Sequence, residues 1–380
     1  MIKRLAVSFV LIVVLVALIS SMIGSVSVAN AAPPPKPTKT PTPTPGSLTP
    51  LQIYGTWHCG NDACTWAAVR TISEFDSKNH WLIDRGDGRP SVNLVVLSFV
   101  NPLKLLNKTD DAGTVDGVPI GMTQDVVNYF KSRGIRVALS IGGITYTDDW
   151  NTALATNPTQ FGLNAADVAQ NLGVGIEIDY EQNADPNLTG LQAFINAYRS
   201  VLPYDPTGSN HAARLTIDLA AGDRWLIALT RKATADWLTT TNPVLDYANA
   251  MVPSRQPSTS GAIANWQEHV AGKAQYDPPI LPLAPSKFAG SLYIVSGTNI
   301  APECNNFANA LQNFTGSFVQ SVAPNGAGVT SGMLGYMFWA SEMPSTRRIT
   351  TAPPNSCEGG VGAGATFYNI PIPMPALRQQ

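Results

Sequence analysis

Charged side chains are scarce in this 380-residue chain. Asp, Glu, Lys and Arg make up 13% of it, whereas an average soluble domain has roughly 25%. The first 50 residues carry four basic and no acidic residues, which leaves 20 basic and 26 acidic residues in the remainder. A body with a negative balance offers no basic stripe to a polyanion, and we therefore expect no nucleic-acid partner.

Metal-binding patterns are missing as well. The four cysteines form no CxxC pair, and the four histidines form no HxxxH pair. Zinc sites normally show such spacings, because two ligands from one turn or helix face share the ion. We accordingly predict neither a metal nor any other cofactor.

The amino-terminal 31 residues have the features of an export signal. A positive pair at residues 3 and 4 precedes an apolar run over residues 5–28, and an AxA site follows at residues 29–31. We expect a signal peptide that is cleaved after Ala31. The run is also long enough to remain in the bilayer as a membrane anchor. In either case the body of the chain is expected outside the cytoplasm, as a secreted or extracellular protein.

The cysteines Cys59, Cys64, Cys304 and Cys357 all follow this signal. An even number in an exported chain favours two disulfides over four unpaired buried thiols. Three pairings are possible. We favour Cys59 with Cys64 and Cys304 with Cys357, because the first pair is close enough in sequence to clip a single loop.

Residues 32–50 form a Pro/Thr-rich linker. Proline alternates there with Thr and Lys, and Leu48 is its one large apolar residue. This composition is typical of an extended spacer. The chain therefore divides into a signal or anchor over residues 1–31, the linker, and one catalytic domain with a C-terminal tail over residues 51–380.

That domain shows short apolar runs alternating with amphipathic stretches, as repeated β-α units do around a parallel sheet. Strands are predicted at residues 52–57, 93–100, 136–141, 175–180, 214–219, 247–252, 290–295 and 332–339. Helices are clearest at residues 123–132, 161–172 and 189–203. Eight strands in about 330 residues predict the α/β class and a single (β/α)8 TIM barrel.

One predicted strand carries a row of acids. Residues 173–181 read GVGIEIDYE, so Glu177, Asp179 and Glu181 share one face while apolar residues occupy the other. Since the apolar face packs under the helices, the carboxylates must point into the barrel, where burial and mutual repulsion raise a pKa. Glu181 closes the strand at its carboxyl end, where TIM-barrel active sites are built.

Two other interpretations of this row are weaker. A structural role would need basic partners, and the predicted strands supply only Arg136 and Arg214, both at strand starts. Alternate carboxylates can also bind Mg²⁺ or Ca²⁺, but no phosphate-binding loop accompanies this strand. We therefore favour acid catalysis over a solvated edge strand or a metal site.

The acid row resembles the DxxDxDxE signature of glycoside hydrolase family 18, the chitinases and their relatives. Aligned on Glu181, the chain has Val174, Glu177 and Asp179 at the other signature positions. Val174 replaces the first acid, and Glu177 is one methylene longer than the family's Asp. Two further elements resemble the family and extend the likeness over roughly residues 52–342.

The first of these elements is SxGG on the third strand, formed by Ser140, Gly142 and Gly143. The second is GxMxW on the eighth strand, which ends at Trp339. In the family these elements lie beside the acids. The resemblance implies that the glycines let the chain pass close beneath the acids and that Trp339 forms the floor under the sugar, although a plain core role for Trp339 is the alternative.

The resemblance also implies a substrate-assisted retaining mechanism. Glu181 would protonate the glycosidic oxygen. Asp179 would orient the substrate's acetamido group as its carbonyl oxygen attacks the anomeric carbon, and Glu177 would share a proton or hydrogen bond with Asp179.

The sixth strand departs from the family pattern MxYD. Met251 matches, but Pro253 and Ser254 stand where the family has Tyr and Asp. The missing Tyr normally contacts the acetamido carbonyl, which puts full chitinase activity or the preferred substrate in doubt. Candidates for replacing that contact or lining the cleft are Tyr54, Tyr247, Gln256, Asn249 and Asp218.

The leading hypothesis is a monomeric extracellular hydrolase of β-1,4-linked N-acetylglucosamine polymers, with a chitin-like oligosaccharide as its partner. A hydrolase of another acetamido glycan, such as the chitobiose core of N-glycans, is the first alternative. A carbohydrate-binding protein without turnover is the second, and retention of Asp179 and Glu181 counts against it.

Overall fold

The computed structural model describes residues 51–84, 90, 92–220, 225–251, 266–293, 333–339 and 341. The chain divides into a unit of residues 1–47 and a unit of residues 48–380, and only the second contains described residues. The predicted signal or anchor, the linker, the C-terminal tail, Cys304 and Cys357 lie outside them. Within the described ranges, no helix is long and apolar enough to cross a membrane.

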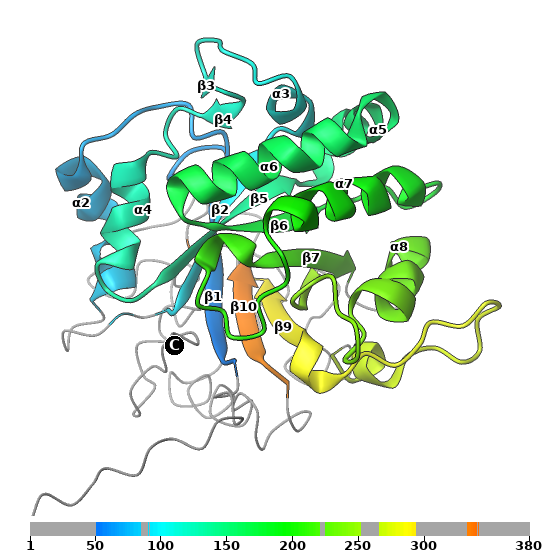
Figure 1. The fold of residues 1–380 in the computed structure, drawn as a ribbon. Helices are drawn as coiled ribbons and strands as arrows, with labels where there is room; N and C mark the ends of the chain where they lie inside the picture. The colour runs from blue at the N-terminus through cyan, green and yellow to red at the C-terminus, as the bar shows by residue number, and fades with distance from the viewer. Residues whose placement is uncertain are drawn as a thin grey trace, which may run out of the picture. The chain divides into compact units, whose positions relative to one another are not determined.

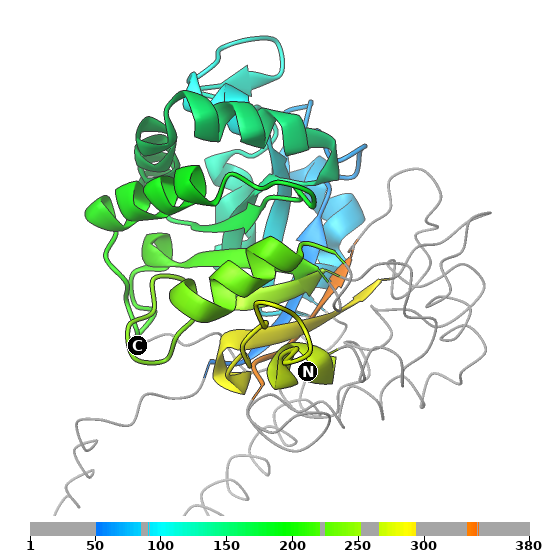
Figure 2. The ribbon, with the colours of Figure 1, turned by 90° about the vertical axis from the view of Figure 1, so that its right-hand side faces the viewer.

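Eight parallel strands close into a barrel (Figure 1), which confirms the predicted TIM-barrel class. The strands are β1 (Ile53–His58), β2 (Leu94–Val100), β5 (Arg136–Gly142), β6 (Gly175–Asp179), β7 (Leu215–Ala220), β8 (Ala248–Met251), β9 (Phe288–Tyr293) and β10 (Gly335–Trp339). Figure 2 shows β10, in orange, between β1 and β9, where it closes the ring. All eight predicted strands are present, with ends shifted by a few residues at most.

Helices cover the outside of the barrel (Figure 1). They are α2 (Ile72–Ile83), α3 (Pro102–Leu106), α4 (Gln124–Lys131), α5 (Thr147–Thr156), α6 (Pro158–Leu172), α7 (Leu188–Val201) and α8 (Ile227–Lys232). Short 3-10 helices are η1 (Ile144–Tyr146), η2 (His211–Ala213) and η4 (Pro285–Lys287), and η3 (Ala233–Trp237) is a π-helix. The short strand β3 (Thr114–Val115) pairs with β4 (Val118–Pro119). The three helices predicted from periodicity are confirmed as α4, α6 and α7.

Local sequence explains where α6 stops and β6 begins. Gly173 ends α6 in the left-handed conformation, with φ of 66°, which glycine adopts at little steric cost. Its N–H donates to Gln170 O, and Val174 N–H donates to Ala169 O. This tight stop starts β6 two residues later and so fixes which of its residues face the barrel interior.

Two apolar clusters follow from the alternation of side chains along the strands. On β2, Val95 and Leu97 belong to a large cluster between strands and helices, while Leu94 and Val96 belong to a small cluster inside the barrel. The inner cluster also contains Trp57 and Met337. Because apolar side chains occupy this part of the interior, the buried polar residues gather toward the two ends of the barrel.

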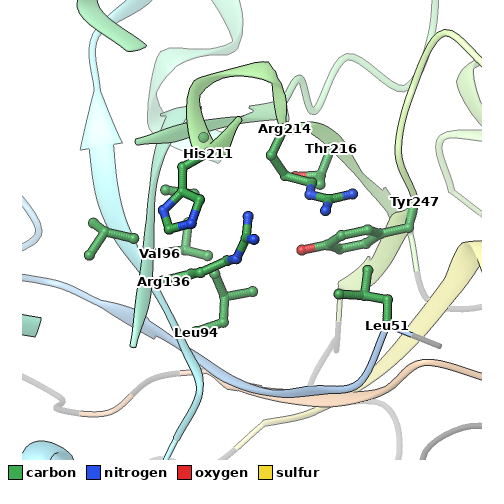
Figure 3. A pocket seen from close by; sticks show the side chains of 11 residues that line it. Leu51, Leu94, Val96, Arg136, His211, Arg214, Thr216 and Tyr247 are labelled. Carbon is green, nitrogen blue, oxygen red and sulfur yellow. The ribbon is translucent and has the colours of Figure 1, made fainter. Parts of the chain in front are cut away.

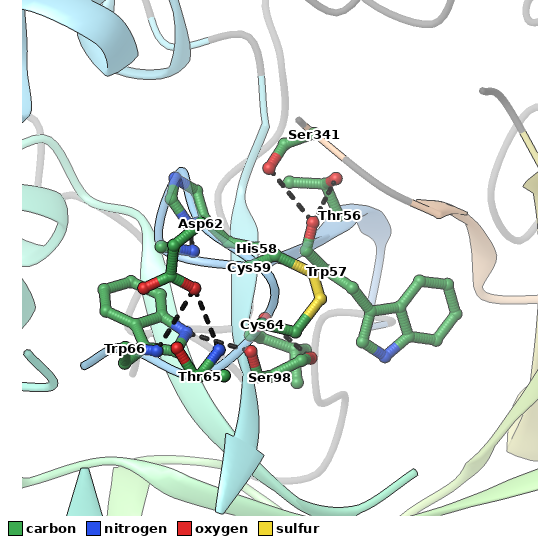
Figure 4. The surroundings of a disulfide bond; sticks show 12 residues. Thr56, Trp57, His58, Cys59, Asp62, Cys64, Thr65, Trp66, Ser98 and Ser341 are labelled. Atoms are coloured by element: carbon green, nitrogen blue, oxygen red, sulfur yellow. Dashed lines mark hydrogen bonds between the residues drawn. A yellow bond between two sulfur atoms is a disulfide. The ribbon is translucent and has the colours of Figure 1, made fainter. Parts of the chain in front are cut away.

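A disulfide joins Cys59 to Cys64 in the loop after β1 (Figure 4), as predicted. Asp62 fixes the same loop, since its Oδ1 accepts a hydrogen bond of 2.8 Å from Thr65 N. Ser341 Oγ donates to Trp57 O at 3.0 Å and ties the segment after β10 to β1. These links hold the carboxyl-end loop of β1 close to the barrel rim.

Candidate active site

The acid row of β6 lies as the alternation predicts. The side chains of Glu177 and Asp179 are 0% and 4% exposed, while Ile176 and Ile178 pack into the outer core. Glu181 follows β6 by two residues, rather than closing the strand, and is half-buried. The acids therefore become more accessible toward the carboxyl end of the barrel.

Glu177 is held by two side-chain donors from opposite parts of the barrel. Trp57 Nε1 on β1 donates to Oε1 at 2.8 Å, and Asn249 Nδ2 on β8 donates to Oε2 at 2.7 Å. Burial raises the pKa of Glu177, and these donors lower it by stabilising the anion. Both oxygens are thereby fixed, so Glu177 is the anchored member of the row.

Asp179 has a different environment. Burial first, and then the charges of Glu181 and Glu177, hold its pKa well above the ordinary range. Its Oδ1 has no hydrogen-bond partner among the described residues. Its environment therefore favours the protonated form of Asp179, and one of its oxygens is left to contact a substrate group.

Asp218 on β7 adds a fourth acid to the row. Its side chain is 2% exposed, and it lies in register with Asn249. Burial and the nearby charges of Glu177 and Asp179 raise its pKa well above the ordinary range. Groups coupled this closely titrate as a set and share protons among them.

The pKa of Glu181 lies near neutral pH. Burial raises its pKa to about 7, and a backbone hydrogen bond from Ile144 opposes this rise. A carboxyl group of this pKa is protonated in a large fraction of molecules at neutral pH and can release its proton there, as a general acid and base must.

The end of β5 passes directly against β6. Gly143 N–H donates to Asp179 O at 3.0 Å. Gly142 has φ of 122°, and a Cβ at that position would lie 2.0 Å from Asp179 O. Ser140 lies beside Glu177 in the strand register. These three residues therefore lie against the acid row, as the resemblance implies.

Four other predicted site residues belong to β1, β8 and β10. Asn249 contacts Glu177, and Met251 lies half-buried at the carboxyl end of β8. Tyr54 and Trp339 belong to β1 and β10, but their side chains lie outside the described residues. Gln256, Pro253 and Ser254 also fall outside them.

Tyr247 requires a correction. It directly precedes β8 and lines a cavity with Arg136 and Arg214, which stand at strand starts. Its side chain does point into the barrel, but at the amino-terminal end. It therefore does not belong to the substrate-binding set at the carboxyl end.

Trp57 contacts Glu177, and the sequence analysis did not name it as a site residue. It lies 120 residues away in sequence, and only closure of the barrel brings the two together. Period-two alternation along residues 53–58 does place it on the inward face, but the same pattern describes several inward residues that contact no acid.

The described residues contain no cluster of three or more His, Cys, Asp or Glu arranged to hold a metal ion. The acids meet Trp and Asn donors and one another instead. The absence of a cofactor stays a prediction.

Comparison with known proteins gives matches among solved structures. No family model and no curated protein matches the chain. A family 18 chitinase from Pseudoalteromonas aurantia aligns at 14% identity and a TM-score of 0.49, over 75% of this chain and 93% of that one. A chitinase from Bacillus thuringiensis aligns at 11% and 0.49, over 86% and 70%.

A family 18 chitinase from Cycas revoluta, solved in complex with allosamidin, aligns at 14% identity and a TM-score of 0.43, over 76% of this chain and 94% of that one. These structures are chitinases, the class of proteins whose motifs the sequence resembles.

Proposed function

We propose that this protein is a glycoside hydrolase of family 18 type that cleaves β-1,4-linked N-acetylglucosamine glycans, chitin or chitooligosaccharides. The observation that carries the proposal is the graded row of acids. Glu177 is anchored, Asp179 is buried with one oxygen that has no partner among the described residues, and Glu181 has a pKa of about 7 at the accessible end.

Glu181 supplies the proton in the proposed mechanism. Its protonated carboxyl donates to the glycosidic oxygen as the bond from that oxygen to the anomeric carbon breaks. The substrate's acetamido oxygen attacks the same carbon and forms a cyclic intermediate. The ionised Glu181 then takes a proton from the water that opens this intermediate, which restores the acid and retains the anomeric configuration.

Asp179 acts on the acetamido group during these steps. Its Oδ1, which has no hydrogen-bond partner in the described part of the chain, accepts the amide N–H as positive charge develops on the attacking group. The proton of Asp179 passes toward the coupled pair of Glu177 and Asp218, so that Asp179 becomes charged only when the intermediate needs an anion. Burial gives this new charge a large effect, because little water screens it.

The place of action belongs to the same proposal. Export is supported by the positive pair, apolar run and AxA site at the amino terminus. The Cys59–Cys64 disulfide agrees with an oxidising compartment. The chain therefore acts outside the cytoplasm, secreted or held by an uncleaved amino-terminal anchor.

The test is release of reducing ends from chitin oligosaccharides by the full-length protein and by Glu181→Gln. Glutamine keeps the shape and removes the acid, so we expect turnover to fall by about 10²–10⁴-fold. The matched control is Asp185→Asn, which removes an exposed acid four residues further on and leaves turnover unchanged.

Two other outcomes would redirect the assignment. Turnover of the chitobiose core of an N-glycan but not of chitin would assign another acetamido glycan as substrate. Oligosaccharide binding without turnover, at any pH, would contradict the enzyme and identify a carbohydrate-binding protein.

A further inference from the structure

Asp218 is a buried acid that lies outside the strand of the sequence signature. On β7 its neighbours Ile217 and Leu219 pack into the outer core, so the side chain of Asp218 points into the barrel. Thr216, one inward position earlier on the same strand, is the register partner of Glu177 on β6. Asp218 is therefore a diagonal neighbour of Glu177 on the adjacent strand.

The arginines of the barrel interior lie toward the opposite end of β7. Figure 3 shows Arg136 and Arg214 beside Thr216 in the cavity at the amino-terminal end. Arg214 directly precedes β7, whereas Asp218 lies in the second half of that strand. A rise of about 3.3 Å per residue puts about 13 Å of strand between these two positions. The guanidinium groups are thus aimed away from Asp218.

The charged groups that act on Asp218 are other acids. Glu177, Asp179 and Glu181 from β6 and its carboxyl end all raise its pKa, in addition to burial. Asn249, its register partner on β8, is uncharged. A negative charge on Asp218 would therefore be added to a buried group of negative charges, which is costly in a place with little water.

Glu177 and Asp218 differ in the hydrogen bonds that they receive. Trp57 Nε1 donates to Glu177 Oε1 at 2.8 Å, and Asn249 Nδ2 donates to Oε2 at 2.7 Å. Asp218 Oδ1 is buried and has no hydrogen-bond partner among the described residues. Donors to a carboxylate favour its charged form, and a buried acceptor without a donor is costly. A proton shared by the two groups therefore resides on Asp218, which receives fewer donors.

A proton on Asp218 replaces repulsion by attraction. Two ionised carboxylates side by side repel each other, whereas the O–H of a protonated Asp218 can donate to Glu177. This hydrogen bond raises the pKa of Asp218 and lowers the pKa of Glu177. Glu177 then accepts hydrogen bonds from three strands, β1, β7 and β8.

We propose that Asp218 is a positioning residue of the active site, a protonated carboxyl group that donates a hydrogen bond to Glu177 and keeps Glu177 ionised. The inference rests on the proposed function, because it assigns the resting protons of the same acid row. The proton that leaves Asp179 in that reaction goes to Glu177, since Asp218 already holds one. Asp218 acts through Glu177 rather than on the substrate, and it keeps its proton through the cycle.

Two substitutions separate a hydrogen-bond donor from a charge at this position. Asp218→Asn keeps the shape and offers an amide N–H to Glu177, so kcat on chitin oligosaccharides should stay within about 3-fold of the wild type. Asp218→Ala removes the donor, and kcat should fall by about 10–10²-fold, the equivalent of one hydrogen bond to a charged group. Rates are compared per folded molecule, as measured by thermal unfolding. An equal loss in both variants would overturn the proposal.

The pH–rate profile gives a readout that a merely structural role of Asp218 would not move. Loss of the donor in Asp218→Ala raises the pKa of Glu177, so the acidic limb should move to higher pH. Asp218→Asn should keep the wild-type limb. If Asp218 were an anion, both variants would remove a negative charge and lower the pKa of Glu177. A limb that moves to lower pH in both variants would contradict the inference.

Neutron crystallography of the full-length wild-type protein in heavy water needs neither a variant nor turnover. Crystals grown at neutral pH should show a deuteron bound to Asp218 on the side that faces Glu177. A bare Asp218 carboxylate would overturn the inference and leave chitin hydrolysis untouched. Conversely, a deuteron on Asp218 in a protein that hydrolyses no acetamido glycan would support the hydrogen bond and contradict the proposed function.

Discussion

The two ends of the barrel carry opposite charges, although the same burial acts on both. At the carboxyl end, Asp179 and Asp218 are buried against other acids, and the pKa of each is raised. At the amino end, burial and Arg214 lower the pKa of Arg136 to about 10. Burial favours the neutral form at each end. It favours the protonated acids at the carboxyl end and disfavours the charged form of Arg136 at the amino end.

This separation explains how the pKa values of the buried acids stay raised. An arginine in contact with Asp179 would lower the pKa of that carboxyl and leave it ionised. The chain instead places Arg136 and Arg214 at strand starts, whereas the acids lie from the middle of β6 and β7 to the residues just beyond β6. In TIM barrels the active site lies at the carboxyl end, and the amino end contributes to stability. In this barrel the buried acids lie toward the carboxyl end and the two arginines lie at the amino end.

The largest expected effect on stability comes from a substitution at the amino end of the barrel. Asp246→Asn removes the carboxylate that pairs with Arg199 and Arg214. It should lower the free energy of unfolding by about 3–5 kcal/mol, because two buried guanidinium groups lose their partner. Chemical denaturation measures the loss, and turnover per folded molecule should stay unchanged.

The control for this variant is Asp236→Asn. Asp236 pairs with Lys232 on the surface, where its side chain is 50% exposed. We expect a loss of only about 0.3–0.5 kcal/mol. Equal losses in the two variants would mean that the buried pair at the amino end does not stabilise the barrel.

A somewhat smaller effect is expected at the carboxyl end from Gly142→Ala. The added Cβ would meet Asp179 O at 2.0 Å with φ held at 122°. The clash should push β5 away from β6, with a loss of roughly 2–3 kcal/mol in stability and a marked loss of turnover.

Gly134→Ala separates backbone strain from the clash. Gly134 has φ of 74° but nothing within 4 Å of an added Cβ. It should cost about 1–2 kcal/mol from strain alone and leave kcat unaltered. A fall in kcat as large as that of Gly142→Ala would show that the close approach of β5 is irrelevant to the site.

The smallest effect tests the anchoring of Glu177. Trp57→Phe removes the Nε1 donor at 2.8 Å from Oε1. Because this hydrogen bond lowers the pKa of Glu177, its loss raises that pKa, and the acidic limb of the pH–rate profile should move to higher pH. Turnover should fall by about 10-fold, the equivalent of one hydrogen bond to a charged group.

Trp66→Phe is the matched variant, since Trp66 Nε1 donates to Ser98 O at 2.9 Å instead of an acid. It should destabilise the fold to a comparable degree without moving the pH profile. Identical profiles for the two tryptophan variants would show that Trp57 only packs.

The alternation of side chains predicted much of this site. It located eight strands and put Glu177, Asp179 and Glu181 on one inward face, because strand geometry leaves two faces only. Tyr247 shows what the alternation of side chains does not predict. It shares the inward face with Asn249, yet it directly precedes β8 and lines the cavity at the amino-terminal end of the barrel. Periodicity specifies a face but not a depth.

Contacts across the barrel were beyond the sequence for another reason. The bond from Trp57 to Glu177 depends on how β1 and β6 face each other after closure. The strand register that sets this distance is decided by packing over the whole ring. Neither spacing nor composition encodes it in a short stretch of chain.

The most direct test of the central claim, that burial tunes Glu181 as the proton donor, is the pH dependence of kcat/KM on chitin oligosaccharides. Because the protonated form is the active acid, activity should fall as pH rises through the raised pKa. The account predicts an alkaline midpoint of about 7, unchanged in Asp185→Asn. A midpoint near the ordinary glutamate value of about 4.3, or a rate that persists far into alkaline pH, would contradict it.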